Sequence, residues 1–143
     1  METLIALTLL AILSASGLYG WQRWQQYQHL WQSGVQVRDY LQWLRSDAGA
    51  HNRTYQITRA DDDRGECLTA VSTCTRDDPR VLRLLWPEVA VDDVTPALGF
   101  YGLRDTAWGG HIRLKSPAGR VMAVVSGWGR IRLCQTAEAV ACQ

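Results

Sequence analysis

Charge is missing from the start of this 143-residue chain. Residues 3–22 contain no Asp, Glu, Lys or Arg, although the whole chain has 14 acidic and 15 basic side chains. This uneven distribution excludes a uniformly soluble globule. The length allows one domain of about 100–150 residues with an appendage, and leaves no room for a two-domain enzyme. The formal net charge of +1 disfavours a general polyanion-binding protein, because such domains carry a clear basic excess.

Sequence motifs of catalysis are also missing. The chain has no Gly-rich phosphate loop, metalloprotease helix or nucleophile elbow. The run 61–63 (Asp-Asp-Asp) lacks the glycine and distal glutamate offsets of a calcium loop and is interpreted as a solvated turn. His29, His51 and His111 are scattered, and the cysteines are not spaced as zinc ligands. We therefore expect no enzymatic activity, no cofactor and no metal.

The uncharged stretch from Thr3 to Gln22 is predicted to be a membrane-spanning helix. As a helix it would cover about 30 Å, the thickness of the hydrocarbon core of a bilayer. A secretory signal is one alternative, with 4–13 as its apolar region and 14–16 (Ser-Ala-Ser) as its cleavage site, but no Lys or Arg precedes the apolar run. A buried core helix is the other alternative.

Two signals disagree about the side of the membrane on which the rest of the chain lies. Arg23 is the nearest positive charge, so the positive-inside rule alone places the large domain in the cytoplasm. The cysteines form two close pairs, Cys67/Cys74 and Cys134/Cys142, which suits short disulfide loops in an oxidising compartment. Four cysteines allow three connectivities, and local pairing is one of them. A basic leader upstream would remove the disagreement.

Large side chains recur at helical spacing beyond the apolar stretch. They are Trp24, Tyr27, Trp31, Val37, Leu41, Leu44 and Ala48. Because no proline interrupts residues 1–48, this spacing predicts one long helix whose second half lays an apolar stripe on a globular domain.

Several features of this helix have more than one reading. An aromatic belt at the membrane surface would explain Trp21, Trp24 and Tyr27, and core packing explains Trp31 and Trp43 equally well. The glycines at 17, 20 and 34 are positions where the helix could bend or let neighbours approach closely. The helix is expected to stop at 47–49 (Asp-Ala-Gly).

Short strands separated by turn signals are predicted from about residue 54 onward. The expected strands are 54–58, 66–71, 81–86, 98–101, 112–115, 121–125 and 130–133, and the expected turns are 60–65, 77–79 and 116–119. We predict an α+β fold in which a long N-terminal helix, transmembrane in its first half, packs on an antiparallel β-sheet domain. Its parts are the membrane half (1–22), the amphipathic half (23–48) and the β-rich domain (49–143).

Alternation in the last strands predicts one buried face and one positive face. In these strands, apolar Ile and Leu residues alternate with four cations, which are Arg113, Lys115, Arg130 and Arg132. Four cations on one face could contact the phosphates of DNA. The alternative, which we favour, is an ordinary solvated face or a subunit contact with acidic residues.

The order of these features resembles that of the type IV pilins and pseudopilins. The segment 2–7 (ETLIAL) resembles the part of those proteins that begins at the glutamate just inside the mature N-terminus. The segment 126–134 (SGWGRIRLC) resembles the closing strand of the GspH/FimT class of minor pilins, in which Gly-Arg-x-Arg recurs. Residues 14–21 and 105–113 resemble the prepilin peptidase-dependent proteins of enterobacteria. The resemblance spans most of the chain and implies a pilin-like fold.

The resemblance also implies a function in binding. A minor pilin helps to initiate or cap a type IV pilus or a type II secretion-like pseudopilus, with other minor pilins and the major pilin as partners. Before assembly it is a single-pass protein of the inner membrane, with its domain in the periplasm. Prepilins of the family begin with a short basic leader, which prepilin peptidase removes before methylation of the new N-terminus. Prepilin peptidase is therefore a further partner if such a leader lies upstream of Met1.

Glu2 is the residue to which the resemblance gives a specific function. In the family, the corresponding carboxylate is thought to pair with the N-terminal ammonium of a neighbouring subunit during extraction from the membrane. This is physically reasonable, because an unpaired carboxylate at the edge of hydrocarbon is costly. The alternative is an exposed acid favourably placed at a helix N-terminus.

Two further functions stay open at this point. Some FimT-like minor pilins are associated with DNA uptake through the Gly-Arg-x-Arg segment, so DNA is an alternative partner. A secreted periplasmic binding domain with a cleaved signal is the third hypothesis.

Overall fold

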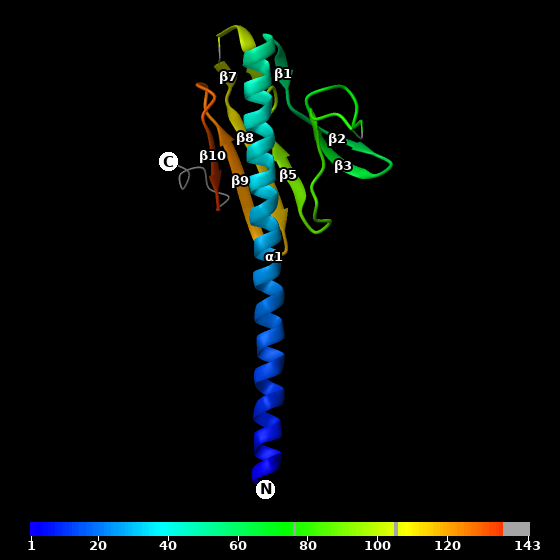
Figure 1. Ribbon diagram of the computed structural model, residues 1–143, viewed down its shortest axis with the longest axis vertical. Helices are drawn as coiled ribbons and strands as arrows, with labels where there is room; N and C mark the ends of the chain where they lie inside the picture. Colours follow the sequence, from blue (N-terminus) through cyan, green and yellow to red (C-terminus); the bar gives the residue numbers. More distant parts are fainter. Residues whose placement is uncertain (76, 105, 136–143) are drawn as a thin grey trace.

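A single long helix and a set of short antiparallel strands make up the protein. The computed structural model describes residues 1–75, 77–104 and 106–135. The helix α1 (Glu2–His51) leaves the N-terminus as a bare rod, and its second half lies across one face of the strands (Figure 1). This confirms a long apolar N-terminal helix combined with antiparallel sheets.

The strands form three antiparallel sheets. Their orders are β1-β6-β7, β10-β9-β8-β5 and β2-β3-β4. The bounds are β1 (Thr54–Gln56), β2 (Thr58–Asp62), β3 (Gly65–Thr69), β4 (Val81–Leu82), β5 (Ala90–Val94), β6 (Gly99–Tyr101), the 3-10 helix η1 (Gly102–Arg104), β7 (Thr106–Trp108), β8 (Gly110–Ser116), β9 (Gly119–Val125) and β10 (Ile131–Cys134).

The 50 residues of α1 divide into an exposed and a packed half. Residues 1–25 are all exposed, and we call them the stalk; Leu30 is the first fully buried side chain. The helix ends at Asn52, whose φ of 54° is left-handed and whose N–H bonds to the Ala48 carbonyl. Asn tolerates this conformation better than most residues, so the helix runs through the expected stop at 47–49.

The packed face of α1 consists of Leu30, Ser33, Gly34, Val37, Tyr40, Leu41, Leu44 and Ala48. The predicted stripe is therefore confirmed from Val37 onward. Trp31 packs against the edge of the core, whereas Trp24 and Trp43 are 53% and 41% exposed. Core packing was thus the wrong explanation for Trp43.

Gly34 is the point where the helix backbone lies closest to the sheet. A Cβ placed there would lie 2.8 Å from Val121 Cγ1 and 3.0 Å from Leu133 Cδ1, so only glycine fits without a shift. Further along, a Cβ on Gly129 would lie 2.7 Å from Arg45 Nε. The strand β9 therefore runs from the level of Gly34 toward the C-terminal end of α1.

The core lies between α1 and the inner faces of the sheets. In β8 and β9, Ile112, Leu114, Val121, Ala123 and Val125 are at most 2% exposed and point toward the helix. Their neighbours along each strand point to the outer face, as the period of two requires. The expected alternation is confirmed for residues 112–115 of β8, whereas in β10 Ile131, Arg132 and Leu133 are all half-buried.

Three strands were not predicted, and their absence from the prediction has physical reasons. Residues 60–62 belong to β2, which pairs with β3, so the expected turn at 60–65 shrinks to the residues around Asp63 and Arg64. In β5 the register shifts between Val91 and Asp93, which hides the alternation. The strand β7 has only three residues. Pairing with neighbours overrides weak local propensity in each case.

Candidate assembly helix and basic cluster

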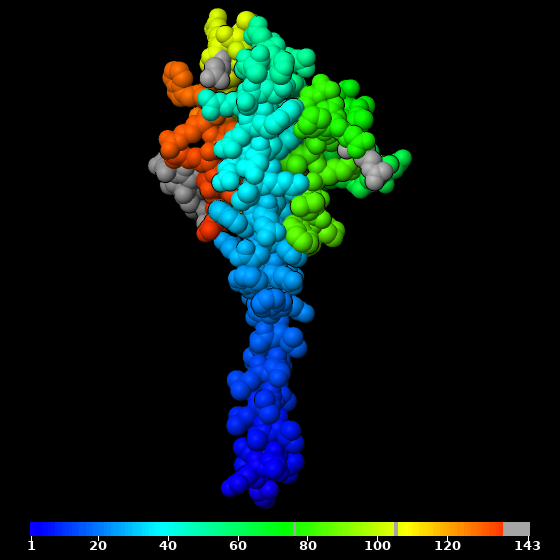
Figure 2. Space-filling model, viewed as in Figure 1, coloured from blue at the N-terminus to red at the C-terminus, as the bar shows by residue number. Residues whose placement is uncertain are grey.

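The stalk is long and apolar enough to cross a membrane, by its length and composition. The most apolar 18-residue segment of the helix is not buried in the protein at all. Figure 2 shows the stalk as a narrow rod clear of the domain. A soluble protein rarely exposes so large a contiguous apolar surface, which marks an interaction with lipid or with other proteins.

Three hydroxyl groups of the stalk are satisfied inside the helix. The hydroxyls of Thr8, Ser14 and Ser16 donate to carbonyls one turn earlier, those of Leu4, Leu10 and Ile12, over 2.7, 2.7 and 3.0 Å. Such bonds spare each hydroxyl the cost of lying unpaired in hydrocarbon. The stalk can therefore enter lipid without leaving these donors unsatisfied.

Aromatic rings and one cation follow at the end of the apolar stretch. Tyr19, Trp21 and Trp24 are 64%, 58% and 53% exposed, and the two indole rings lie 5.2 Å apart. The guanidinium of Arg23 lies 6.0 Å from the centre of the Tyr19 ring. Amphipathic rings and a snorkelling cation suit the surface of a bilayer.

Glu2 occupies the first turn of α1 and is exposed. Within residues 1–75, 77–104 and 106–135, no basic side chain forms an ion pair with it. The carboxylate is thus placed at one end of the stalk, about 30 Å from the opposite end of the apolar stretch. It is available to a partner and interacts favourably with the helix N-terminus.

The junction between stalk and domain contains residues that the sequence did not single out. The segment 83–88 runs along α1: Gln36 Nε2 donates to the Arg83 carbonyl over 3.0 Å, and the Trp86 indole stacks on the His29 ring with centroids 3.6 Å apart. Glu88 binds the same imidazole. The aromatic and proline residues of 86–87 were the available signal, but their partners lie far away in sequence.

The four cations of the expected basic cluster are distributed over two strands and a turn. Arg113 and Lys115 lie on β8, and Arg132 on β10. All three are on the outer face, because their register partners in β9 alternate with the residues that pack in the core under α1. Arg130 precedes β10 and lies in the turn, where its N–H bonds to Ser126 Oγ. Arg130 was expected to be the first residue of the strand, but the turn extends through it and β10 begins at Ile131.

Asp92 of β5 reduces the charge of this cluster. Its carboxylate lies 3.8 Å from Arg113 Nη1 and 3.6 Å from Lys115 Nζ. His111 pairs in the same way with Asp93 at 3.0 Å. The sequence did not reveal these partners because β5 itself was missed.

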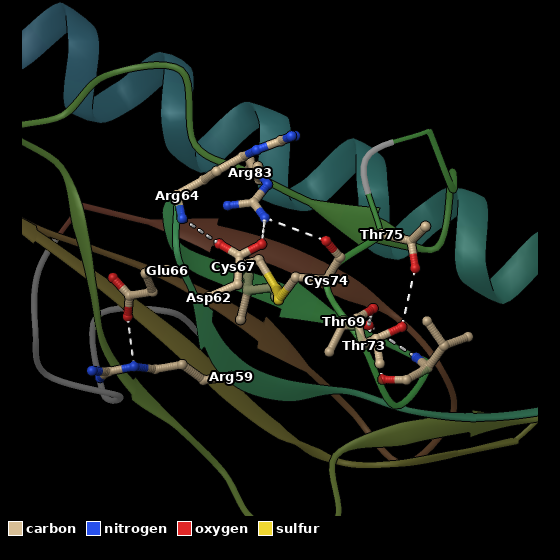
Figure 3. The surroundings of a disulfide bond; sticks show 12 residues. Arg59, Asp62, Arg64, Glu66, Cys67, Thr69, Thr73, Cys74, Thr75 and Arg83 are labelled. Carbon is tan, nitrogen blue, oxygen red and sulfur yellow. Dashed lines mark hydrogen bonds and ion pairs between the residues drawn. A yellow bond between two sulfur atoms is a disulfide. The ribbon is translucent and has the colours of Figure 1, made fainter.

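The disulfide between Cys67 and Cys74 braces the sheet formed by β2, β3 and β4. Beside it, Asp62 accepts hydrogen bonds from the Arg64 backbone and the Arg83 guanidinium, and Arg83 also donates to the Cys74 carbonyl (Figure 3). The Arg83 contact is the main cause that lowers the pKa of the Asp62 carboxyl. One of the two expected disulfide loops is therefore present. The other involves Cys142, which lies outside the described residues.

The described residues include His, Cys, Asp and Glu side chains, which are the usual metal ligands in proteins. In that part of the chain, no group of three or more His, Cys, Asp or Glu side chains is placed to hold a metal ion. No family model, curated protein or solved structure matches the chain.

Proposed function

We propose that this protein is a minor pilin of the GspH/FimT class, which helps to initiate or cap a type IV pilus or pseudopilus by binding other pilins. The observation that carries the proposal is the division of one 50-residue helix into a wholly exposed first half, uncharged from residue 3 to 22, and a second half packed on a β-domain. A helix of this kind can be held by lipid before assembly and by other helices afterwards. No reaction of its own is required.

Glu2 is the proposed assembly residue. Its carboxylate stands at the end of the stalk, where lipid gives it no counter-charge. Pairing with the N-terminal ammonium of a neighbouring pilin would relieve this cost and set the axial position of one helix against the next. Other minor pilins and the major pilin are the proposed partners.

The proposed location before assembly is the inner membrane, with the β-domain in the periplasm. The disulfide at Cys67 supports this side of the membrane, because disulfides persist in oxidising compartments. A basic leader upstream of Met1 and its removal by prepilin peptidase are part of the same proposal.

DNA binding is the less favoured candidate. Arg113 and Lys115 share one carboxylate, and Arg130 lies off the strand, so fewer charges face solvent together than the sequence suggested. If DNA is nevertheless the partner, Arg130→Gln with Arg132→Gln will weaken a salt-sensitive affinity of the full chain. An unchanged affinity would reject this candidate.

The test of the membrane-anchored pilin combines extraction with topology. In a piliated bacterium, the full-length precursor is expected to resist alkaline carbonate extraction, to be cleaved by protease in spheroplasts, and to carry the Cys67–Cys74 disulfide. Leu9→Arg with Leu10→Arg is expected to release it from the membrane, because charges are costly at the bilayer centre. A matched change in the packed domain, Arg104→Gln, should leave anchoring intact. Extraction of the unchanged protein by carbonate would contradict the proposal.

A further inference from the structure

Two cations face each other at the turn between β8 and β9. Lys115 is directly opposite Arg120 in the register of these strands. Like charges in this arrangement repel, which destabilises a sheet. Arg113 and Lys115 share the single carboxylate of Asp92, and no acidic side chain in the described parts of the chain forms an ion pair with Arg120. The end of this hairpin therefore has an excess of positive charge without an internal partner.

This turn, Ser116–Gly119, lies at the end of the sheet that faces the stalk (Figure 1). Val121 touches Gly34, and β9 runs from there away from the stalk, so Arg120 and the turn lie on the stalk side of Gly34. Gly34 is roughly 18 Å along the helix from Gln22, at 1.5 Å per residue. The turn lies about 10 Å nearer to the stalk than Val121 does, at 3.3 Å per residue of strand.

The turn thus lies roughly 8 Å beyond the end of the apolar stretch when α1 stands upright. The polar layer of a bilayer extends about 5–8 Å beyond the hydrocarbon on each side. Long Lys and Arg side chains at the turn can bridge the remaining distance to lipid phosphates.

Arg23 lies on the same side of the helix as the turn. It precedes Gly34 by eleven residues, which is three turns plus about 20° at 3.6 residues per turn. Its guanidinium packs over the exposed Tyr19 ring, at the expected level of the membrane surface. Lys115, Arg120 and Arg23 therefore lie along one side of the molecule, between the hairpin and the expected lipid surface.

We propose that the β8–β9 turn docks on anionic phospholipid headgroups, with Lys115 and Arg120 contacting lipid phosphates and Arg23 adding a third cation at the interface. This inference rests on the proposed membrane anchor. Docking on one side of the helix would hold the domain at a fixed tilt and rotation before assembly. It must then release when the stalk leaves the membrane.

Hydrogen exchange of the full chain in lipid nanodiscs tests this docking. With anionic phosphatidylglycerol in the disc, the backbone amides around the turn are expected to exchange at least about fivefold more slowly than in phosphatidylcholine alone, since one cation near an anionic surface contributes about that factor. High salt should abolish the difference. The variant Lys115→Gln with Arg120→Gln should lose it, whereas the charge-matched control Arg64→Gln with Arg104→Gln should retain it.

Two results would overturn the inference, and they differ in what else they reject. Equal exchange in both lipids, or an undiminished difference in the double variant at the turn, rejects docking while the protein is still anchored. Recovery of the chain free of discs rejects the anchor and the docking together. Because both substituted side chains of the turn are exposed, folding is checked by exchange in the core of β9, which should be unchanged.

Discussion

The Nδ1 atom of His29 lies 2.5 Å from Oε1 of Glu88, at the level of α1 where the domain begins to cover the helix. This contact ties the loop before β5 to the helix. On the N-terminal side of this contact the helix is bare, and on the C-terminal side one face of the helix is buried. The pair therefore marks the boundary between the stalk, which makes no contact with the domain, and the part of the helix that is packed in the domain.

Glu88→Gln is expected to lower the free energy of unfolding by about 1 kcal/mol at neutral pH, because a hydrogen bond to a charged, partly buried group is lost. The hydrogen bond from His29 is the main cause that lowers the pKa of the Glu88 carboxyl. A lowered pKa means that this stability is present above the ordinary glutamate pKa of about 4.3 and is lost as the pH falls through the value in the folded state.

Thermal unfolding in detergent across pH 3–7 checks this prediction. The difference between the unchanged protein and Glu88→Gln should shrink toward acid pH. Asp63→Asn, an exposed acid in the β2–β3 turn, controls for the loss of one charge. Parallel stability curves at all pH values would show that the junction contributes nothing through this carboxylate.

Gly34→Leu is expected to destabilise the domain by about 2 kcal/mol or more. The new side chain would collide with Val121 and Leu133, and overpacking of this kind exceeds the gain from better helix propensity. Gly49→Leu is the matched control, since a Cβ there meets nothing within 4 Å. Denaturant unfolding of both variants should separate them. Equal stability would mean that the helix does not lie on β9 and β10 at this point.

Removal of the disulfide by Cys67→Ala with Cys74→Ala is expected to cost about 2 kcal/mol, the value for a short closed loop. The sequence separation is only seven, so the loss should be local to the sheet of β2, β3 and β4. Hydrogen exchange should accelerate in those strands and stay slow in β8 and β9. Faster exchange throughout the protein would contradict the local bracing described here.

Tyr40→Phe is expected to destabilise the protein by about 1 kcal/mol, because the buried hydroxyl donates to the Arg80 carbonyl. Burial is the main cause that raises the pKa of Tyr40 above its ordinary value, with the charge of Asp78 as the second. This stability is therefore present below about pH 10, the pKa of an unfolded tyrosine, and is lost as the pH rises further.

Ultraviolet titration checks the Tyr40 prediction. Tyr40→Phe should leave the tyrosinate signal near pH 10 unchanged, because burial raises the pKa of this hydroxyl and it keeps its proton at that pH. A reduced signal near pH 10 in Tyr40→Phe would show that this hydroxyl is open to solvent.

The helix could be predicted from the sequence because its evidence is local. The missing charges define the stalk, and large residues at helical spacing define the packed face from Val37 onward. Ser33 was not recognised as part of that face, since it contributes to packing by being small. Gly34 was recognised as a point of bending or close approach, and the sheet does approach the helix closely there. The end at Asn52 depends on one left-handed residue, which spacing does not reveal.

The sheet and the surface clusters depend on partners that are distant in the sequence. Two adjacent acids and a bulge hide β5, and with it the partner of Arg113 and Lys115. The contact of His29 with Glu88 joins residues 59 positions apart. Only the register of the strands and the path of the loops bring such groups together.

Assembly of the full-length precursor carrying Glu2→Ala is the most direct test of the proposed pilin function. The precursor is expressed with the codons upstream of Met1 in a piliated bacterium, and the protein is quantified in sheared filaments and in membranes. Glu2→Ala should stay in the membrane, with its Cys67–Cys74 disulfide formed, and be absent from filaments, whereas Thr3→Ala should assemble normally. Normal incorporation of the Glu2→Ala protein into filaments would contradict the account.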